Sequence, residues 1–264
     1  FTKNGLHKEH SPDYHIFMTK FVHLLQKSKL MEEGTISNLV NRSVDAIDWM
    51  CLPDGKILPF GDSKPISKNR RVTPLLNKNP PQLGLRYFDE GGLVVHKASK
   101  DNEDSDGYLA FTGSFHSRQH KHADDFTFQL FSDGMGLFTD AGTYTYQYEL
   151  EERMFIESTR AHNTVEIGGC NYSRFQKDVF GSSINYVTEI NNCVIINASI
   201  HRENIVPSNL PNNKIKLALS GIKIDIEQSR TIAYQPGDFM LIIDHLTSPE
   251  KHDYIQWFHL YPDL

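Results

Sequence analysis

From Gly92 to the end of the chain, short apolar segments alternate with turn sequences, and no helical periodicity separates them. Turn signals include Asp133-Gly134, Gly168-Gly169 and Pro236-Gly237. Many strands at this spacing, without helices between them, favour an antiparallel β-sandwich, so the fold is predicted to be mainly β. The predicted strands are residues 93–97, 108–115, 126–132, 136–140, 163–167, 184–189, 194–200, 214–226, 230–234, 239–244 and 254–260.

Two helices are predicted before this β-rich region. Ser11-Pro12-Asp13 is a helix start, because Ser caps, Pro fits the first turn and Asp complements the helix dipole. The apolar positions of the first helix are Tyr14, Phe17, Met18, Phe21, Leu24 and Leu25, and those of the second are Ile36, Leu39, Val40, Val44, Ile47 and Met50. Two such helices are typical of the end of a helical domain, and their apolar faces need partners beyond these residues.

The patterns divide the sequence into three parts. Residues 1–52 are helical, residues 53–90 form a connection rich in Pro, Gly, Asn and Lys, and residues 91–264 form the β-sandwich. The connection contains a basic run from Lys64 to Lys78. This run is either a solvated loop or a local contact for an acidic polymer.

Composition and charge argue against several classes of protein. With 264 residues, 39% of them hydrophobic and 23% charged, the chain is an ordinary globular one with ample core for one or two domains. The formal net charge of −6 does not favour nucleic acid or an anionic membrane as partner. No apolar run approaches the roughly 20 residues of a membrane span. The start has neither a signal-peptide pattern nor a Met, as expected of a fragment or a processed piece. Three cysteines without metal-type spacing argue against a disulfide framework.

Histidines gather in one stretch, where His116, Arg118, His120 and His122 occupy every second position. Successive side chains of a strand point to opposite faces, so these four are predicted to share one strand face. Dense histidines of this kind indicate a metal site or acid–base chemistry. The alternative is a surface strand that happens to carry histidines.

His122, Asp140 and His162 are candidate metal ligands. Two imidazoles and a carboxylate from separate strands can hold Zn²⁺ and leave a coordination position open. The same set resembles the facial triad of non-haem iron enzymes, so the ligands alone do not choose the metal.

Three tyrosines are candidates for a functional role. Tyr14 lies at the head of the first helix, where it either packs in the core or takes part in proton transfer. Tyr144 and Tyr146 stand at alternate positions after Asp140, where they either contact a sugar or pack as strand aromatics.

Taken together, these features resemble the heparinase II/III-like polysaccharide lyases, which join an α/α-toroid to an antiparallel β-sandwich. The matching segments cover most of the chain in the family's order: Glu9-x-Ser11-Pro12-x-Tyr14-His15, Pro53-Asp54-Gly55 with Phe60-Gly61-Asp62-Ser63, His120-x-His122-Ala123-Asp124, Phe138-x-Asp140-x-Gly142-Thr143-Tyr144-x-Tyr146 and Arg160-Ala161-His162-Asn163-Thr164-Val165. Residues 1–52 then look like the last helices of such a toroid.

The resemblance implies roles for particular residues. Tyr14 and His120 match the catalytic residues, and His122, Asp140 and His162 match the ligands of a metal, expected to be Zn²⁺. The candidates for substrate contact are His15, Arg118, Tyr144, Tyr146 and Arg160.

The resemblance also implies a reaction and a partner. The expected activity is β-elimination on an acidic, uronic-acid-containing polysaccharide, in a periplasmic or secreted setting. In the family, an earlier toroid helix supplies an asparagine or histidine that neutralises the substrate carboxylate. That helix is absent from these residues, so a missing helical domain is expected to pack on residues 1–52.

Two other functions stay open. A cupin-type metal enzyme also uses His-x-His, an acid and a later His on a β-scaffold, but it has no need of Tyr14. A carbohydrate-binding or structural β-sandwich with a structural zinc needs no catalytic residue at all.

Overall fold

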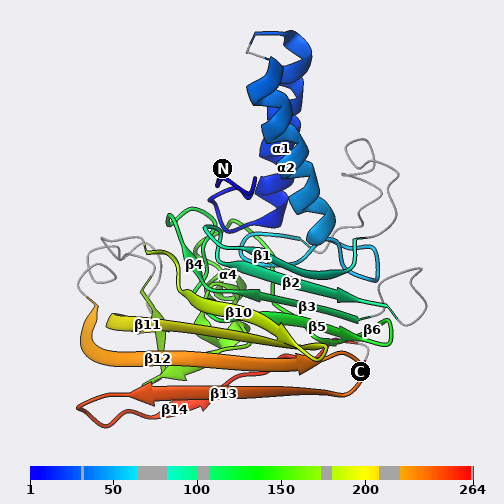
Figure 1. The fold of residues 1–264 in the computed structure, drawn as a ribbon. Coiled ribbons are helices and arrows are strands. Elements are labelled where there is room, and N and C mark those ends of the chain that lie inside the picture. Colours follow the sequence, from blue (N-terminus) through cyan, green and yellow to red (C-terminus); the bar gives the residue numbers. More distant parts are fainter. Residues whose placement is uncertain (31–32, 65–81, 100–106, 174–179, 208–220, 263) are drawn as a thin grey trace.

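The computed structural model describes residues 1–30, 33–64, 82–99, 107–173, 180–207, 221–262 and 264. Helices α1 (Pro12–Ser28) and α2 (Glu33–Trp49) pack side by side and project from the sheets (Figure 1). Ser11 caps α1, because its Oγ accepts a hydrogen bond from the backbone N–H of Tyr14 at 3.4 Å. The predicted helix start is confirmed. None of the described helices is long and apolar enough to span a membrane.

Helix α1 buries a different face from the one that its apolar stripe suggests. Ile16, Thr19 and Val22 are its buried side, whereas Phe17 is 64% exposed and Phe21 is 51% exposed. The hydroxyl of Thr19 hydrogen-bonds the carbonyl of the preceding turn, which lets a polar residue occupy the buried side. The helix therefore presents a row of large apolar side chains to solvent: Phe17, Phe21 and Leu24.

Two antiparallel sheets follow, and the predicted β-sandwich is confirmed. The first has the order β1 (Gly84–Phe88), β2 (Leu93–Ala98), β3 (Gly107–Thr112), β5 (Phe128–Ser132) and β6 (Met135–Phe138). The second has the order β13 (Phe239–Thr247), β12 (Ile222–Gln235), β11 (Cys193–Pro207), β8 (Cys170–Tyr172), β7 (Val165–Ile167) and β14 (Tyr254–Gln256), with β10 (Ile184–Ile190) paired to β11. The short strands β4 (Ser114–Phe115) and β9 (Gly181–Ser182) pair with each other, and helix α4 (Glu151–Ile156) and the 3-10 turn η1 (Thr159–Ala161) precede β7.

Several strand boundaries differ from the predicted ones. Strand β1 lies inside the segment predicted as a connection, and the basic run from Lys64 onward falls almost entirely outside the described residues. Strand β12 is continuous where the sequence suggested a break near residues 227–229. It stays extended there because it pairs on both sides, with β11 and β13.

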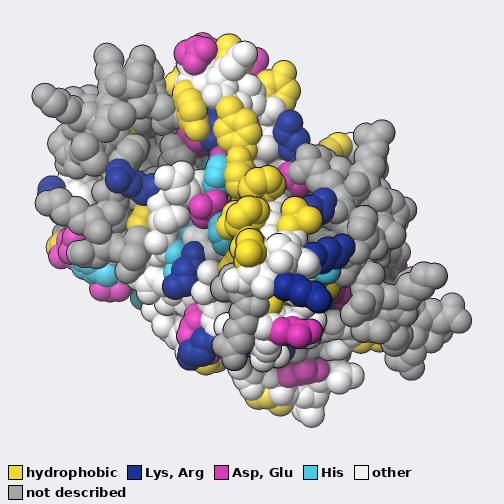
Figure 2. All heavy atoms as spheres, turned by 90° about the horizontal axis from the view of Figure 1, so that it is seen from above, with side chains coloured by type: hydrophobic (Ala, Val, Ile, Leu, Met, Phe, Trp, Pro, Cys, Tyr) yellow, Lys and Arg dark blue, Asp and Glu magenta, His cyan; other side chains and the backbone are white. Residues whose placement is uncertain are grey.

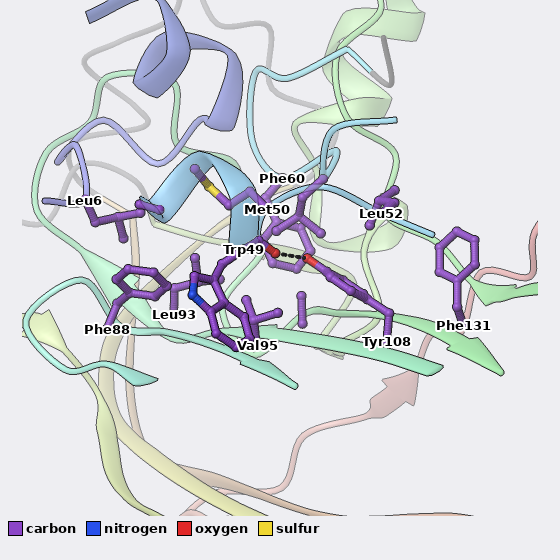
Figure 3. Close-up of a cluster of buried hydrophobic side chains, with 13 residues drawn as sticks. Leu6, Trp49, Met50, Leu52, Phe60, Phe88, Leu93, Val95, Tyr108 and Phe131 are labelled. Atoms are coloured by element: carbon purple, nitrogen blue, oxygen red, sulfur yellow. Dashed lines mark hydrogen bonds between the residues drawn. The ribbon is translucent and has the colours of Figure 1, made fainter. Parts of the chain in front are cut away.

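The first sheet lies between two hydrophobic layers. One face packs on the second sheet, with residues such as Val94 and Phe111 against Ile196 and Ile232. The other face packs on the end of α2 and the segment after it, where Trp49 lies over the sheet and the hydroxyl of Tyr108 donates to its carbonyl at 3.1 Å (Figure 3). The two-sided packing explains why β2 and β3 are buried at every position but the last.

Candidate functional site

A tight turn at Gly61-Asp62-Ser63 joins the helical hairpin to the sandwich. Gly61 has φ +52°, and a Cβ there would lie 2.4 Å from the carbonyl oxygen of His120 and 2.6 Å from that of His10. Only glycine tolerates this backbone conformation and this close approach. The turn is thereby wedged between two histidine-bearing loops, and the N–H of Asp62 donates to the His120 carbonyl at 3.2 Å.

The same turn fixes the start of α1. The hydroxyls of Ser63 and Ser11 lie 2.8 Å apart, and the backbone N–H of Asp13 donates to Ser63 Oγ at 3.1 Å. The carbonyl of Ser63 accepts from the N–H of Thr143 at 3.0 Å, in the segment after β6. Three segments far apart in the chain therefore meet at a buried serine.

Tyr14 and His120 come together at this junction. Their rings stack with centroids 3.4 Å apart and an interplanar angle of 19°. The Tyr14 hydroxyl is 3.3 Å from the Tyr146 hydroxyl, and His120 Nε2 is 3.6 Å from a Glu9 carboxylate oxygen. The His120 side chain retains 17% exposure, so the pair stays open to solvent. Seen from above, the molecule shows histidine and charged side chains beside a band of hydrophobic ones (Figure 2).

The Asp62 carboxylate is the centre of the network. One oxygen lies 3.0 Å from His120 Nδ1, and the other lies 2.9 Å from His122 Nε2. Arg153 donates to both oxygens, at 2.5 and 3.2 Å. Burial alone would raise the pKa of the Asp62 carboxyl, but the hydrogen bonds from His120, His122 and Arg153 hold that pKa far below its usual range. Asp62 is therefore a buried anion with three donors around it.

Arg153 on α4 supplies the compensating charge. Its guanidinium also pairs with Glu157 one helical turn later, at 2.5 Å, and donates to Thr143 Oγ1 at 3.1 Å. The guanidinium carbon lies 5.2 Å from the ring centroids of both Tyr146 and Tyr148. A buried arginine is stable here because two carboxylates and two aromatic faces surround it.

Sequence reasoning assigned no role to Asp62 or Arg153. Asp62 was noted only as part of a matching segment, and its position after Phe60-Gly61 was the one available signal. Arg153 follows Glu151 and Glu152 in a short helix that looks like solvated surface.

His122 and His162 are both fully buried, and each has a carboxylate against one ring nitrogen. Asp62 lies on His122 Nε2, and Asp140 lies 2.9 Å from His162 Nδ1. Burial would lower the pKa of His162, but the Asp140 carboxylate raises it, whereas burial lowers the pKa of His122. The Asp140 carboxylate also accepts from Thr127 Oγ1 at 2.7 Å, so it is firmly oriented.

The predicted metal ligands lie near one another without converging on one point. The ring centroids of His122 and His162 are 5.4 Å apart, and His122 Nδ1 and His162 Nε2 have no hydrogen-bond partner within the part of the chain that is described. Over the same residues, no group of three or more His, Cys, Asp or Glu side chains could hold a metal ion. As placed, Asp140 supports His162 from its Nδ1 side. The structure offers two buried ring nitrogens for a cation, and zinc at this triad stays a prediction.

The shared strand face predicted for the four alternating residues is wrong. Strand β4 ends at Phe115, and His116, Arg118, His120 and His122 lie in an irregular loop. His120 has φ +57°, so the chain reverses there and alternation no longer applies. His120 and His122 are brought together by their contacts with Asp62, and not by a shared strand.

His15, which was predicted to contact substrate, lies between the two helices. The side chain is 1% exposed, its Nε2 lies 2.8 Å from the Ser43 carbonyl on α2, and its Nδ1 accepts from the N–H of His7 at 3.0 Å. Burial lowers the pKa of His15 to about 4. The residue is a neutral structural link between the two helices.

The other substrate candidates differ in position. Tyr144 is 64% exposed and Tyr146 is 44% exposed, both on the irregular segment after β6, so they are not core aromatics. Arg118 is exposed on the loop that carries His120. Arg160 pairs with Glu166 of β7 at 2.7 Å, so its guanidinium is engaged at the sandwich.

Comparison with known proteins agrees with this architecture. Residues 80–206 match the sequence model of the heparinase II/III-like C-terminal family. Among solved structures, the heparan sulfate lyase HepC of Pedobacter heparinus superposes with a TM-score of 0.70 at 18% identity, over 98% of this chain and 41% of that one. A heparinase III superposes with a TM-score of 0.71 at 17% identity, over 95% of this chain and 40% of that one. None of the curated proteins matches the chain significantly in sequence.

At these identities the superpositions establish the fold alone, and the chain spans about two fifths of the length of these structures. The family match over 80–206 covers the first sheet, the His120 loop and the start of the second sheet, from β7 to nearly the end of β11. Residues 80–206 therefore match the heparinase II/III-like C-terminal family, and the two leading helices with the antiparallel sandwich have the fold of the heparinase structures.

Proposed function

We propose that the chain is the C-terminal part of a polysaccharide lyase that cleaves a uronic-acid-containing polysaccharide by β-elimination. The observation that carries the proposal is the stacked pair of Tyr14 and His120, partly exposed and joined to the exposed Tyr146. Two groups able to move protons lie side by side where a polymer can reach them.

The reaction needs two proton transfers. A base removes the proton on C5 of the uronate, the bond from C4 to the leaving oxygen breaks, a double bond forms between C4 and C5, and an acid protonates the departing oxygen. Tyr14 and His120 are the proposed base and acid, and the order depends on which face of the sugar each one meets. Charge builds on the uronate carboxylate in the transition state, so a neutralising group is also needed. By the family resemblance, that group comes from the missing helical part.

Zinc is proposed as a structural ion beside this pair. The unpartnered His122 Nδ1 and His162 Nε2 would bind it, with Asp140 and Asp62 supporting the two rings. The ion would supply a fixed positive charge that holds the His120 loop to the segment before β7. We expect chelation to lower the thermal unfolding temperature, measured by circular dichroism, and His122→Ala or Asp140→Ala to remove the bound metal, measured by elemental analysis. A metal-free protein with the wild-type unfolding temperature would contradict this.

A helical domain is proposed as the partner of α1. The exposed row Phe17, Phe21 and Leu24 is apolar surface that a helical neighbour would cover. The matched solved chains are more than twice the length of this one, which leaves room for such a domain.

The test of activity uses the full-length protein with a panel of uronate polymers. Growth of ultraviolet absorbance from the unsaturated product supports the lyase, and we expect His120→Ala to abolish that growth while the circular dichroism spectrum stays native. Binding of a polymer without product would favour the carbohydrate-binding alternative. A cupin-type enzyme would be indifferent to Tyr14, so the stacking of Tyr14 on His120 counts against that alternative.

A further inference from the structure

We propose that Asp62 is a positioning residue that fixes the tautomers of His120 and His122 together, one through each carboxylate oxygen. His120 is thereby held with its proton on Nδ1 and its lone pair on Nε2. This inference rests on the proposed function for the meaning of His120, although the arrangement itself can be tested without any substrate.

The argument begins with what a carboxylate can do. An ionised carboxylate only accepts hydrogen bonds, so every nitrogen that faces it at bonding distance must carry a proton. His120 Nδ1 faces one oxygen at 3.0 Å and His122 Nε2 faces the other at 2.9 Å. In the neutral rings the lone pairs then lie on His120 Nε2 and His122 Nδ1.

The two lone pairs have different surroundings. His122 Nδ1 is buried without a partner among the described residues, beside the ring of His162. His120 Nε2 is 3.6 Å from the Glu9 carboxylate, beyond hydrogen-bonding distance, on the side chain that keeps partial exposure. The Asp62 carboxylate thus fixes the lone pair of His122 on a buried nitrogen and the lone pair of His120 on a nitrogen of the partly exposed ring beside Tyr14.

Arg153 makes this arrangement possible. Its two nitrogens contact both oxygens of Asp62, which keeps the carboxylate charged in a buried place and leaves room for both histidines. Glu157 is the matched control, because its carboxylate pairs with the same guanidinium at 2.5 Å.

The experiment is nitrogen-15 NMR of the whole protein labelled at histidine, at about pH 8, where a neutral imidazole shows its tautomer. His120 signals are assigned by their loss in His120→Ala. We expect wild-type His120 as the Nδ1–H tautomer. Asp62→Asn offers one acceptor and one donor where the carboxylate offered two acceptors, so one ring must change its tautomer. Glu157→Gln should keep the wild-type pattern for both rings.

Kinetics give the second measurement. Asp62→Asn should lower kcat at least about 100-fold with KM changed less than about threefold, because the variant misorients a proton-transfer group and leaves the binding surface in place. A role in folding alone would lower the amount of active protein and leave the kcat of the folded fraction unchanged.

The proposal is overturned if wild-type His120 is the Nε2–H tautomer, or if folded Asp62→Asn keeps both wild-type tautomers. Should Asp62→Asn fail to fold, the wild-type spectrum still decides. A protein that shows the expected tautomers and no lyase activity would refute the proposed function and leave the positioning role standing.

Discussion

At the scale of single residues, the hydroxyl and the ring of Tyr14 have different proposed roles, the hydroxyl in proton transfer and the ring in packing. The Tyr14 hydroxyl lies 3.3 Å from the exposed Tyr146 hydroxyl, while the ring supplies the stacking on His120. Tyr14→Phe should therefore lower kcat at least about 100-fold and change the free energy of unfolding by less than about 1 kcal/mol. Product absorbance and denaturant unfolding measure the two effects.

Tyr108→Phe is the matched control for this variant. It removes a buried hydroxyl that donates to the Trp49 carbonyl at 3.1 Å. This hydroxyl has no part in the proposed proton transfer. We expect it to lower the free energy of unfolding by about 1–2 kcal/mol, since the carbonyl loses a buried partner, and to leave the turnover of the folded protein intact. Equal turnover of wild type and Tyr14→Phe would show that Tyr14 has a packing role only.

The buried His15 makes a prediction about pH. Its pKa is lowered to about 4 by burial, against about 6.5 in the unfolded chain, so the folded state binds fewer protons between these values. Its contribution to stability is complete above pH 6.5 and is lost as pH falls toward 4, by up to about 3 kcal/mol. His15→Gln keeps a donor and an acceptor without titrating, so its unfolding free energy should fall less over this range. Parallel curves for the two proteins would contradict the assignment.

At the scale of elements, the turn at Gly61 has no room for a side chain. Gly61→Ala would bring a Cβ to 2.4 Å from the His120 carbonyl, so backbone must move, and we expect a loss of at least about 2 kcal/mol of unfolding free energy together with loss of turnover. Gly55→Ala is the control, because Gly55 also has a positive φ, of +76°, but open space around it. It should cost about 1 kcal/mol and leave turnover unchanged. Similar losses for both variants would show that strain alone, and not the contact with His120, explains the effect.

Local periodicity predicted whether a segment is a helix or a strand better than it predicted which face of that element is buried. The cap at Ser11, the two helices and most strands follow from short-range rules, and the structure has them. The buried face of α1 did not follow, because Phe17 and Phe21 have the spacing of a core stripe whether or not a partner is present. Strand β12 was divided in two because the polar residues Glu227 to Ser229 look like a turn until their pairing on both sides is known.

The site was predictable only where residue type signals chemistry. Tyr14, His120, His122 and His162 stood out as unusual residues in a recognisable order. Asp62 and Arg153 did not, because their importance lies in a contact across 91 residues of chain. The burial of His15 was not predictable, because burial is a property of the packed helix pair and no pattern within residues 9–15 reveals it.

At the scale of the whole molecule, the exposed face of α1 predicts a difference between this chain and a longer protein. Phe21 is 51% exposed, so Phe21→Ala should change the unfolding free energy of the 264-residue chain by less than about 0.5 kcal/mol. In the full-length protein, where the proposed helical domain covers this face, it should cost about 2–3 kcal/mol. Ile16→Ala, at a position only 2% exposed, should be costly in both. A neutral Phe21→Ala in the full-length protein would contradict the proposed packing.

The stacking of Tyr14 on His120 spans two bodies, the helical hairpin and the sandwich, and the Ser63 hydroxyl helps tie the foot of α1 to the junction. A swing of the hairpin about that point would part the two rings while the hydrophobic layer between the two sheets stayed intact. If the chain acts as proposed, heating should abolish turnover some degrees below the temperature at which the sheets unfold. Turnover would then report this motion earlier than circular dichroism does.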